Sequence, residues 1–128
     1  MYKIILVGAG QIGSRYLQGL AKLKENIEIT VLDPNKNSLK IAKSRWNEVA
    51  INQNKVHKIE WITDFQNHKN VDLAIIATSS KNRDLIVKKV SDIFRPTYWI
   101  IEKVLAQSKE QIDSILKVTN KSMGAWVN

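Results

Sequence analysis

The sequence contains no cysteine, only two prolines and only five glycines among its 128 residues. The absence of cysteine excludes disulfide bonds, thiolate metal sites and a thiol nucleophile. So little proline and glycine also excludes a collagen-like or low-complexity chain. No apolar run approaches the roughly 20 residues of a membrane span, and the first residues do not resemble a secretory signal. We therefore expect one folded domain over residues 1–128 that works in the cytoplasm, without a metal site or a membrane contact.

Acidic residues are also scarce, because 12 Asp and Glu stand against 20 Lys and Arg, which gives a net charge of +8. Sixteen of the basic residues are Lys, and they occur one or two at a time along the whole chain. A nucleic-acid-binding protein more often gathers its basic residues into a patch or stripe. We therefore expect no nucleic-acid partner, although the positive charge favours the approach of an anionic ligand.

Apolar runs alternate with amphipathic segments along the chain. Short β-branched or apolar runs predict six strands, at residues 3–7, 28–32, 58–62, 71–77, 98–101 and 124–127. Apolar residues at helical spacing predict four helices, at residues 11–23, 37–50, 81–94 and 109–120. This alternation indicates an α/β fold of the doubly wound Rossmann type: a mostly parallel six-stranded sheet, strand order 3-2-1-4-5-6, with helices on both faces.

A glycine motif follows the first predicted strand. Residues 8–13 read GAGQIG, which fits the G-x-G-x-x-G pattern between a strand and a helix. In that pattern Gly8 permits a tight turn, Gly10 leaves room for a pyrophosphate, and Gly13 lets the helix pack on the strand. The helix N-terminus adds free N–H groups that favour an anion. The motif predicts a dinucleotide site whose candidate cofactor-binding residues are Gly8, Gly10, Gln11, Ile12 and Gly13.

An acidic residue stands at the expected distance from this motif. Asp33 lies twenty residues after Gly13, at the end of the second predicted strand. A carboxylate there accepts hydrogen bonds from the adenosine ribose hydroxyls and repels the 2′-phosphate of NADP. We therefore predict NAD as the cofactor, with NADP disfavoured, although an Asp-Pro pair by itself is also common in turns.

Polar residues follow the fourth and fifth predicted strands, at the same edge of the sheet. Thr78, Ser79 and Ser80 are candidates for the nicotinamide end of the site, although such a run also serves as a helix N-cap. Glu102 and Lys103 follow the fifth strand. Glu102 is a candidate cofactor contact, and Lys103 is the candidate catalytic residue, because a Lys can donate a proton to a reacting oxygen. An exposed charged pair without a function is the alternative.

Taken together, these segments resemble the Gfo/Idh/MocA family of NAD(P)-dependent oxidoreductases. The resemblance covers the whole chain and rests on GAGQIGSRYLQGL, VLDPN, VDLAIIATSS, IIEKVLAQS and AWVN. The family's usual E-K-P appears as Glu102-Lys103-Val104, and its usual T-P-x-x-x-H appears as Thr78-Ser79 with Arg83 at the His position. Both departures resemble a branch associated with capsule or lipopolysaccharide sugar metabolism.

The resemblance implies hydride transfer between nicotinamide and a sugar or sugar nucleotide, with Lys103 near the reacting oxygen. It also implies a C-terminal substrate domain, which these 128 residues lack, so we expect the chain alone to be inactive. His57 and His68 fall in predicted loops and are expected to be solvated rather than catalytic. Trp126 and Val127 lie on the last predicted strand and are expected to expose apolar surface through which the chain can self-associate.

Two other functions remain open. A stand-alone NAD(H)-binding regulatory module would need the same cofactor site without chemistry. A methyltransferase that uses S-adenosylmethionine also has a glycine-rich first turn and an acidic residue after the second strand. The sixth predicted strand and the Glu102-Lys103 pair favour a dehydrogenase over the methyltransferase.

Overall fold

The computed structural model describes residues 1–50, 56–66 and 68–128. Its sheet contains β1 (Tyr2–Val7), β2 (Ile27–Leu32), β3 (Lys58–Ile62), β4 (Leu73–Ile76), β5 (Tyr98–Ile101) and β6 (Gly124–Val127). Its helices are α1 (Gln11–Leu20), α2 (Lys36–Ala50), α3 (Arg83–Phe94) and α4 (Lys109–Thr119). Among the described residues, none of the helices has the length and apolar character needed to cross a membrane.

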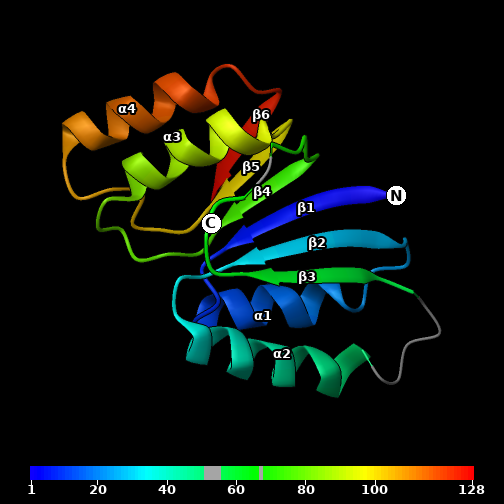
Figure 1. Cartoon of the computed structure of the whole chain (residues 1–128). Coiled ribbons are helices and arrows are strands. Elements are labelled where there is room, and N and C mark those ends of the chain that lie inside the picture. The colour runs from blue at the N-terminus through cyan, green and yellow to red at the C-terminus, as the bar shows by residue number, and fades with distance from the viewer. Residues whose placement is uncertain (51–55, 67) are drawn as a thin grey trace.

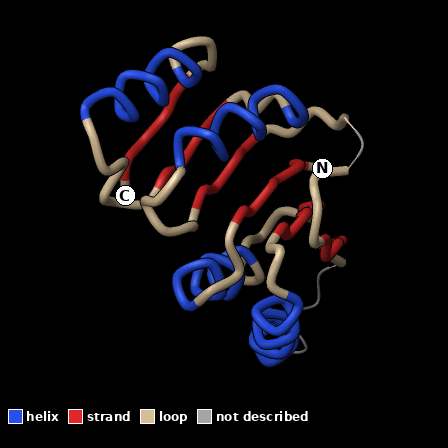
Figure 2. The backbone as a smooth tube through the Cα atoms, turned by 60° about the vertical axis from the view of Figure 1, so that its left-hand side comes forward, coloured by secondary structure: helices blue, strands red, loops and turns tan. Residues whose placement is uncertain are grey.

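The six strands form one sheet in the order β3-β2-β1-β4-β5-β6 (Figure 1). Every neighbouring pair is parallel, so the predicted fold and strand order are confirmed, and the sheet is wholly rather than mostly parallel. Helices α1 and α2 cover one face over β1, β2 and β3, whereas α3 and α4 cover the opposite face over β4, β5 and β6 (Figures 1 and 2). The molecule therefore has three layers, with the sheet in the middle.

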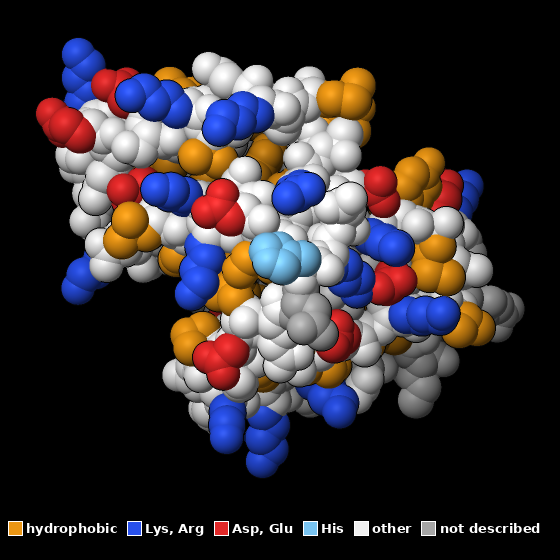
Figure 3. Space-filling view, turned by 45° about the horizontal axis from the view of Figure 1, so that its top comes forward, with side chains coloured by type: hydrophobic (Ala, Val, Ile, Leu, Met, Phe, Trp, Pro, Cys, Tyr) orange, Lys and Arg blue, Asp and Glu red, His pale blue; other side chains and the backbone are white. Residues whose placement is uncertain are grey.

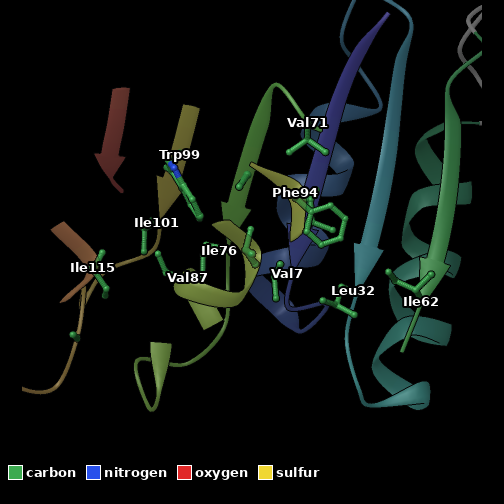
Figure 4. Close-up of a cluster of buried hydrophobic side chains, with 14 residues drawn as sticks. Val7, Leu32, Ile62, Val71, Ile76, Val87, Phe94, Trp99, Ile101 and Ile115 are labelled. Carbon is green, nitrogen blue, oxygen red and sulfur yellow. The ribbon is translucent and has the colours of Figure 1, made fainter. Parts of the chain in front are cut away.

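The core consists of two apolar clusters, one on each face of the sheet. Strand β1 contributes to both, since Ile4 and Leu6 belong to the cluster under α1 and α2, and Ile5 and Val7 belong to the other. Figure 4 shows this second cluster, in which side chains of the sheet meet those of α3 and α4. All four β1 residues are buried, as expected for an apolar run in the middle of a parallel sheet.

The chain reverses its winding direction between β1 and β4. The loop after β1 leads to α1 on one face, and the loop after β4 leads to α3 on the other, although the two strands are neighbours. Loops that diverge in this way leave a crevice at the carboxyl ends of the strands, where ligands of open α/β sheets bind. The fold thus directs the search for a site to this edge.

Helix α1 differs from its prediction in length and in orientation. It ends at Leu20 rather than at residue 23, and the N–H groups of Lys22 and Leu23 bond the carbonyls three residues earlier, at 3.1 Å each. Ile12 and Leu23, two of the apolar residues at helical spacing, are 47% and 38% exposed. The buried face consists of small residues together with Leu17, because α1 lies too close to the sheet for larger side chains; its buried residues are Gly13, Ser14 and Leu17.

The start of α3 also differs from prediction. The helix begins at Arg83, after Asn82 in the left-handed conformation with φ of 54°, rather than at residue 81. Its N-cap has no side-chain hydrogen bond. The Thr-Ser-Ser run before it therefore does not act as the helix cap, which was the alternative interpretation of those residues.

The two histidines lie in different environments. His68 is exposed, as expected. His57 is half-buried, so its prediction as a solvated residue is wrong: its Nδ1 accepts from Ile27 N at 3.3 Å, and its ring packs edge-on against Trp46. Because His57 directly precedes β3, it lies at the amino end of the strands, opposite the crevice.

The contact between α1 and the turn before it predicts a stability difference between two glycines. A Cβ at Gly13 would lie 1.9 Å from the Gly8 carbonyl oxygen, whereas a Cβ at Gly19 would meet nothing within 4 Å. We expect Gly13→Ala to lower the free energy of unfolding by about 1–3 kcal/mol or more, since backbone must move. Gly19→Ala, the matched control, should raise it by up to about 1 kcal/mol, because alanine favours a helix. Urea unfolding of both variants measures the difference, and equal effects would contradict this packing.

Candidate functional site

A cavity of about 760 Å³ lies in the crevice at the carboxyl edge of the sheet. The loops that follow β1, β2, β3 and β4 form its floor, and α3 forms one wall. It includes five of the residues singled out in the sequence: Gly8, Gly10, Asp33, Thr78 and Ser79. The cavity brings the glycine motif and the acidic residue together as the sequence predicted.

The three motif glycines have different surroundings. Gly8 has a φ of 97°, and a Cβ on it would lie 2.8 Å from the Ala77 backbone. Gly13 is buried against Gly8, as described above. Gly10 is exposed, and nothing lies within 4 Å of the position its Cβ would take. The first and third glycines thus permit close packing, while the second faces open space beside the first turn of α1, whose N–H groups have no helical acceptor.

Asp33 binds the glycine-rich turn directly. Its Oδ2 accepts a hydrogen bond from Ala9 N at 2.8 Å, and its Oδ1 accepts one from Asn35 N at 2.8 Å. Each carboxylate oxygen can accept more than one hydrogen bond, so both retain capacity for a ligand in the cavity. The sequence predicted the ligand-binding carboxylate but not its second task, which is to hold the turn.

Several cavity residues were not singled out in the sequence. Thr63, Asp64 and Phe65 follow β3, and Lys89 of α3 lies over the Phe65 ring, with Nζ 4.6 Å from its centroid. The predicted strand order already placed the end of β3 at this edge, so that signal was available. The remaining α3 lining residues, Ile86 and Ile93, carried only the ordinary apolar period of a helix.

Of the three hydroxyl residues after β4, two line the cavity and one does not. Thr78 and Ser79 line the cavity, and Thr78 Oγ1 is buried without a hydrogen-bond partner. Ser80 is half-buried and does not line the cavity, and its carbonyl accepts from Arg83 N at 3.4 Å. Ser79 is exposed and lines the cavity, so its hydroxyl can meet a bound molecule.

A second hollow of about 490 Å³ lies on the opposite face, between α1 and the strands β4 and β5. Ile12 and Glu102 line it rather than the larger cavity. The Glu102 carboxylate accepts from Tyr16 OH at 2.5 Å and from Asn128 Nδ2 at 2.9 Å, which ties α1 to the ends of β5 and β6. Burial, followed by this bond to Glu102, raises the pKa of Tyr16 to about 12, so its hydroxyl stays protonated and donates at neutral pH.

Two other predicted residues lie outside both hollows. Lys103 is exposed, and its backbone N–H donates to Asn128 O at 3.0 Å. Gln11 is exposed at the start of α1 and lines a separate polar hollow of about 240 Å³ with Arg15 and Arg45. The structure therefore brings the glycines, Asp33, Thr78 and Ser79 together, but not Gln11 or Lys103.

Charges of both signs are mixed at the surface. On the face shown in Figure 3, Lys and Arg side chains are interspersed with Asp and Glu. Within the described residues no group of three or more His, Cys, Asp or Glu is arranged to hold a metal ion. The charged side chains that line the crevice are Asp33, Asp64 and Lys89.

The strand order and the glycine turn define the class of this protein, a doubly wound Rossmann domain. A family model described as the TrkA-N domain matches residues 4–121. The chain belongs to the TrkA-N domain family. No curated protein sequence matches it.

Solved structures with the same fold include three oxidoreductases. A Gfo/Idh/MocA family oxidoreductase from Vibrio cholerae has a TM-score of 0.72 at 18% identity, over 100% of this chain and 38% of its own. An oxidoreductase from Agrobacterium radiobacter, in complex with NAD+, L-tartaric acid and magnesium, gives 0.70 at 16% identity, over 99% and 35%. The lactate dehydrogenase from Cryptosporidium parvum gives 0.71 at 16% identity, over 93% and 40%. The chain thus spans two fifths or less of the length of these structures, which share its fold.

Proposed function

We propose that this chain binds NAD(H) and supplies the cofactor half of an oxidoreductase. The open space over Gly10, next to the Asp33 carboxylate and the start of α1, carries this proposal. A pyrophosphate needs a position without a Cβ and with free N–H donors, and a ribose needs a carboxylate acceptor beside it. Gly10 and Asp33 line one cavity, and α1 begins directly after Gly10.

The residues present fit the two ends of the dinucleotide. Asp33 would accept from the adenosine ribose, and the apolar wall of Phe65, Ile86 and Ile93 would cover the adenine. Gly8, Gly10 and Gly13, with the N–H groups of Gln11 and Ile12, would hold the pyrophosphate. The nicotinamide end would lie toward the residues of the β4 and β5 loops, namely Thr78, Ser79, Ser80 and Glu102. The Agrobacterium radiobacter structure, which is a complex with NAD+, supports the choice of cofactor.

The reaction we propose is hydride transfer between nicotinamide and a sugar or sugar nucleotide, in surface polysaccharide biosynthesis in the cytoplasm. It rests on the resemblance of the sequence to Gfo/Idh/MocA oxidoreductases. Lys103 would donate a proton to, or accept one from, the reacting oxygen, and its exposure leaves its ammonium free to meet substrate. A substrate domain outside these 128 residues would enclose the site and exclude water. Trp126 and Val127, 57% and 55% exposed, offer apolar surface to such a domain or to a second copy.

A regulatory module that binds NAD(H) without chemistry is the second candidate. The position of Lys103 favours it, because this residue lines neither of the two hollows. Binding of the cofactor alone does not separate the two functions. An assay of turnover, made on the protein that the complete reading frame encodes, separates them.

The open space over Gly10 predicts how NADH binding responds to a side chain there. Gly10 has an ordinary φ of −71°, so Gly10→Val should fold while its side chain fills the pyrophosphate position. We expect the unaltered chain to bind NADH, detected by energy transfer from its four Trp residues, and Gly10→Val to bind at least about 100-fold more weakly. Circular dichroism controls for the fold. Equal binding by this variant would mean that the loop is only a turn.

The Asp33 carboxylate should make the chain bind NAD more tightly than NADP. A hydrogen bond to a charged acceptor contributes about 1.5–3 kcal/mol, so Asp33→Asn should weaken NAD by about tenfold or more and NADP by less. Asp64→Asn removes a carboxylate from the same cavity without touching the turn, and it should change NAD affinity by less than about threefold. Titration calorimetry measures both cofactors. If the unaltered chain bound NAD and NADP alike, the role given to Asp33 would be wrong.

Loss of the Lys103 side chain should affect substrate turnover but not NADH binding. We expect the 128-residue chain to show no dehydrogenase activity, because Lys103 lines neither the larger cavity nor the second hollow. In the protein of the complete reading frame, Lys103→Ala should lower turnover of the sugar substrate by about 10²–10⁴, with NADH affinity nearly unchanged. Lys81→Ala, an exposed Lys at the start of the β4–α3 segment, serves as the control. Turnover unaffected by Lys103→Ala would remove Lys103 from the reaction, and no turnover with any sugar would favour the regulatory module.

A further inference from the structure

Arg83, the first residue of α3, is a buried cation without an ion-pair partner. Its side chain is 2% exposed. The salt bridge present among the described residues joins Lys69 and Glu28, so no carboxylate there forms a salt bridge with Arg83. Burial lowers the pKa of Arg83, as expected for a cation withdrawn from water. Burying a charge is costly unless it is hydrogen-bonded, so its position needs an explanation.

The Arg83 guanidinium binds backbone carbonyls from two separate loops. Nη2 donates to Thr78 O in the loop after β4. Nη1 donates to Glu102 O and Val104 O in the loop after β5, and Leu105 O lies 3.4 Å away. A planar guanidinium with donors on both sides can bridge two chains at once, which an ammonium cannot do in the same geometry.

The two bridged loops carry the polar residues at one end of the crevice. Thr78 lines the larger cavity, and Glu102 lines the second hollow. Gly10 lines the larger cavity and Ile12 lines the second hollow, so the start of α1 lies between the two. The Asp33 end of the cavity is held differently, by the bond from Ala9 N to the carboxylate, and makes no hydrogen bond to Arg83. The two ends of the crevice therefore have independent supports.

We propose that Arg83 is a positioning residue that sets the nicotinamide end of the site. By binding Thr78 and the segment of Glu102 to Leu105 at once, it fixes the distance between the two loops and, with it, the place of Lys103. This inference rests on the proposed function, because the nicotinamide end exists only if a dinucleotide binds over Gly10. Replacing Arg83 should therefore affect binding of the nicotinamide half of the ligand and not of the adenosine half.

Two ligands that share the adenosine half test the assignment. ADP-ribose lacks the nicotinamide ring and NADH carries it, so the ratio of their dissociation constants reports on the nicotinamide end alone. We expect Arg83→Lys, which keeps the charge, and Arg83→Gln, which keeps two donors, to weaken NADH by about tenfold while ADP-ribose changes by less than about twofold. Arg95→Lys, at an exposed arginine just after the opposite end of α3, should leave both ligands unchanged.

Hydrogen exchange followed by mass spectrometry supplies a readout that does not need a ligand. In the Arg83 variants, peptides over residues 78–82 and 103–106 should exchange about tenfold faster or more, while peptides over β1 and α1 remain protected. Uniformly faster exchange, with loss of both ligands, would show a general folding role and overturn the proposal. An unchanged ligand ratio with protected loops would overturn it as well.

The same experiment separates this inference from the proposed function. If the unaltered chain binds neither NADH nor ADP-ribose, the proposed function fails, and the nicotinamide role of Arg83 fails with it. If the unaltered chain binds both ligands and the Arg83 variants keep their ratio, only the positioning role is wrong.

Discussion

The start of α1 lies so close to the turn after β1 that no side chain fits between them. Gly13 and Gly8 are in contact through the Gly8 carbonyl, and Gly8 in turn lies against the backbone after β4. This contact sets the position of the start of α1 over the sheet edge. Asp33 then bonds the same turn from the neighbouring strand, at Ala9 N. A shift of α1 by the width of a methyl group would therefore move the N-terminus of α1 and the Asp33 carboxylate relative to each other.

The sequence predicted the parts of this structure that local chemistry decides. The strand boundaries of β3, β5 and β6 match their apolar runs residue for residue. The glycine motif and Asp33 were predicted together because their spacing is set by one strand, one helix and one turn. Once the alternation of strands and helices had indicated the strand order, both had to lie at the same edge of the sheet. The predicted cavity residues Gly8, Gly10, Asp33, Thr78 and Ser79 do meet there.

The sequence could not predict features that depend on how the elements pack. Ile12 was predicted as a cofactor contact of the glycine motif, but its side chain lines the hollow on the opposite face of the sheet. Glu102 was predicted at the cofactor, yet Tyr16 and Asn128, distant from it along the chain, hold its carboxylate. Arg83 carried no local pattern of a core residue, because a buried guanidinium is stabilised only by carbonyls that the fold brings to it.

The buried guanidinium also changes which groups the β4 and β5 loops can offer a ligand. The carbonyls of Thr78, Glu102 and Val104 turn inward to Arg83, so those acceptors are already occupied. At this end of the cavity the exposed Ser79 side chain offers a hydroxyl. At the opposite end, Asp33 presents carboxylate oxygens directly to the cavity. The cavity therefore suits a ligand that donates hydroxyl hydrogen bonds to Asp33 at one end and needs few backbone acceptors at the other. A dinucleotide with its ribose at Asp33 meets both conditions.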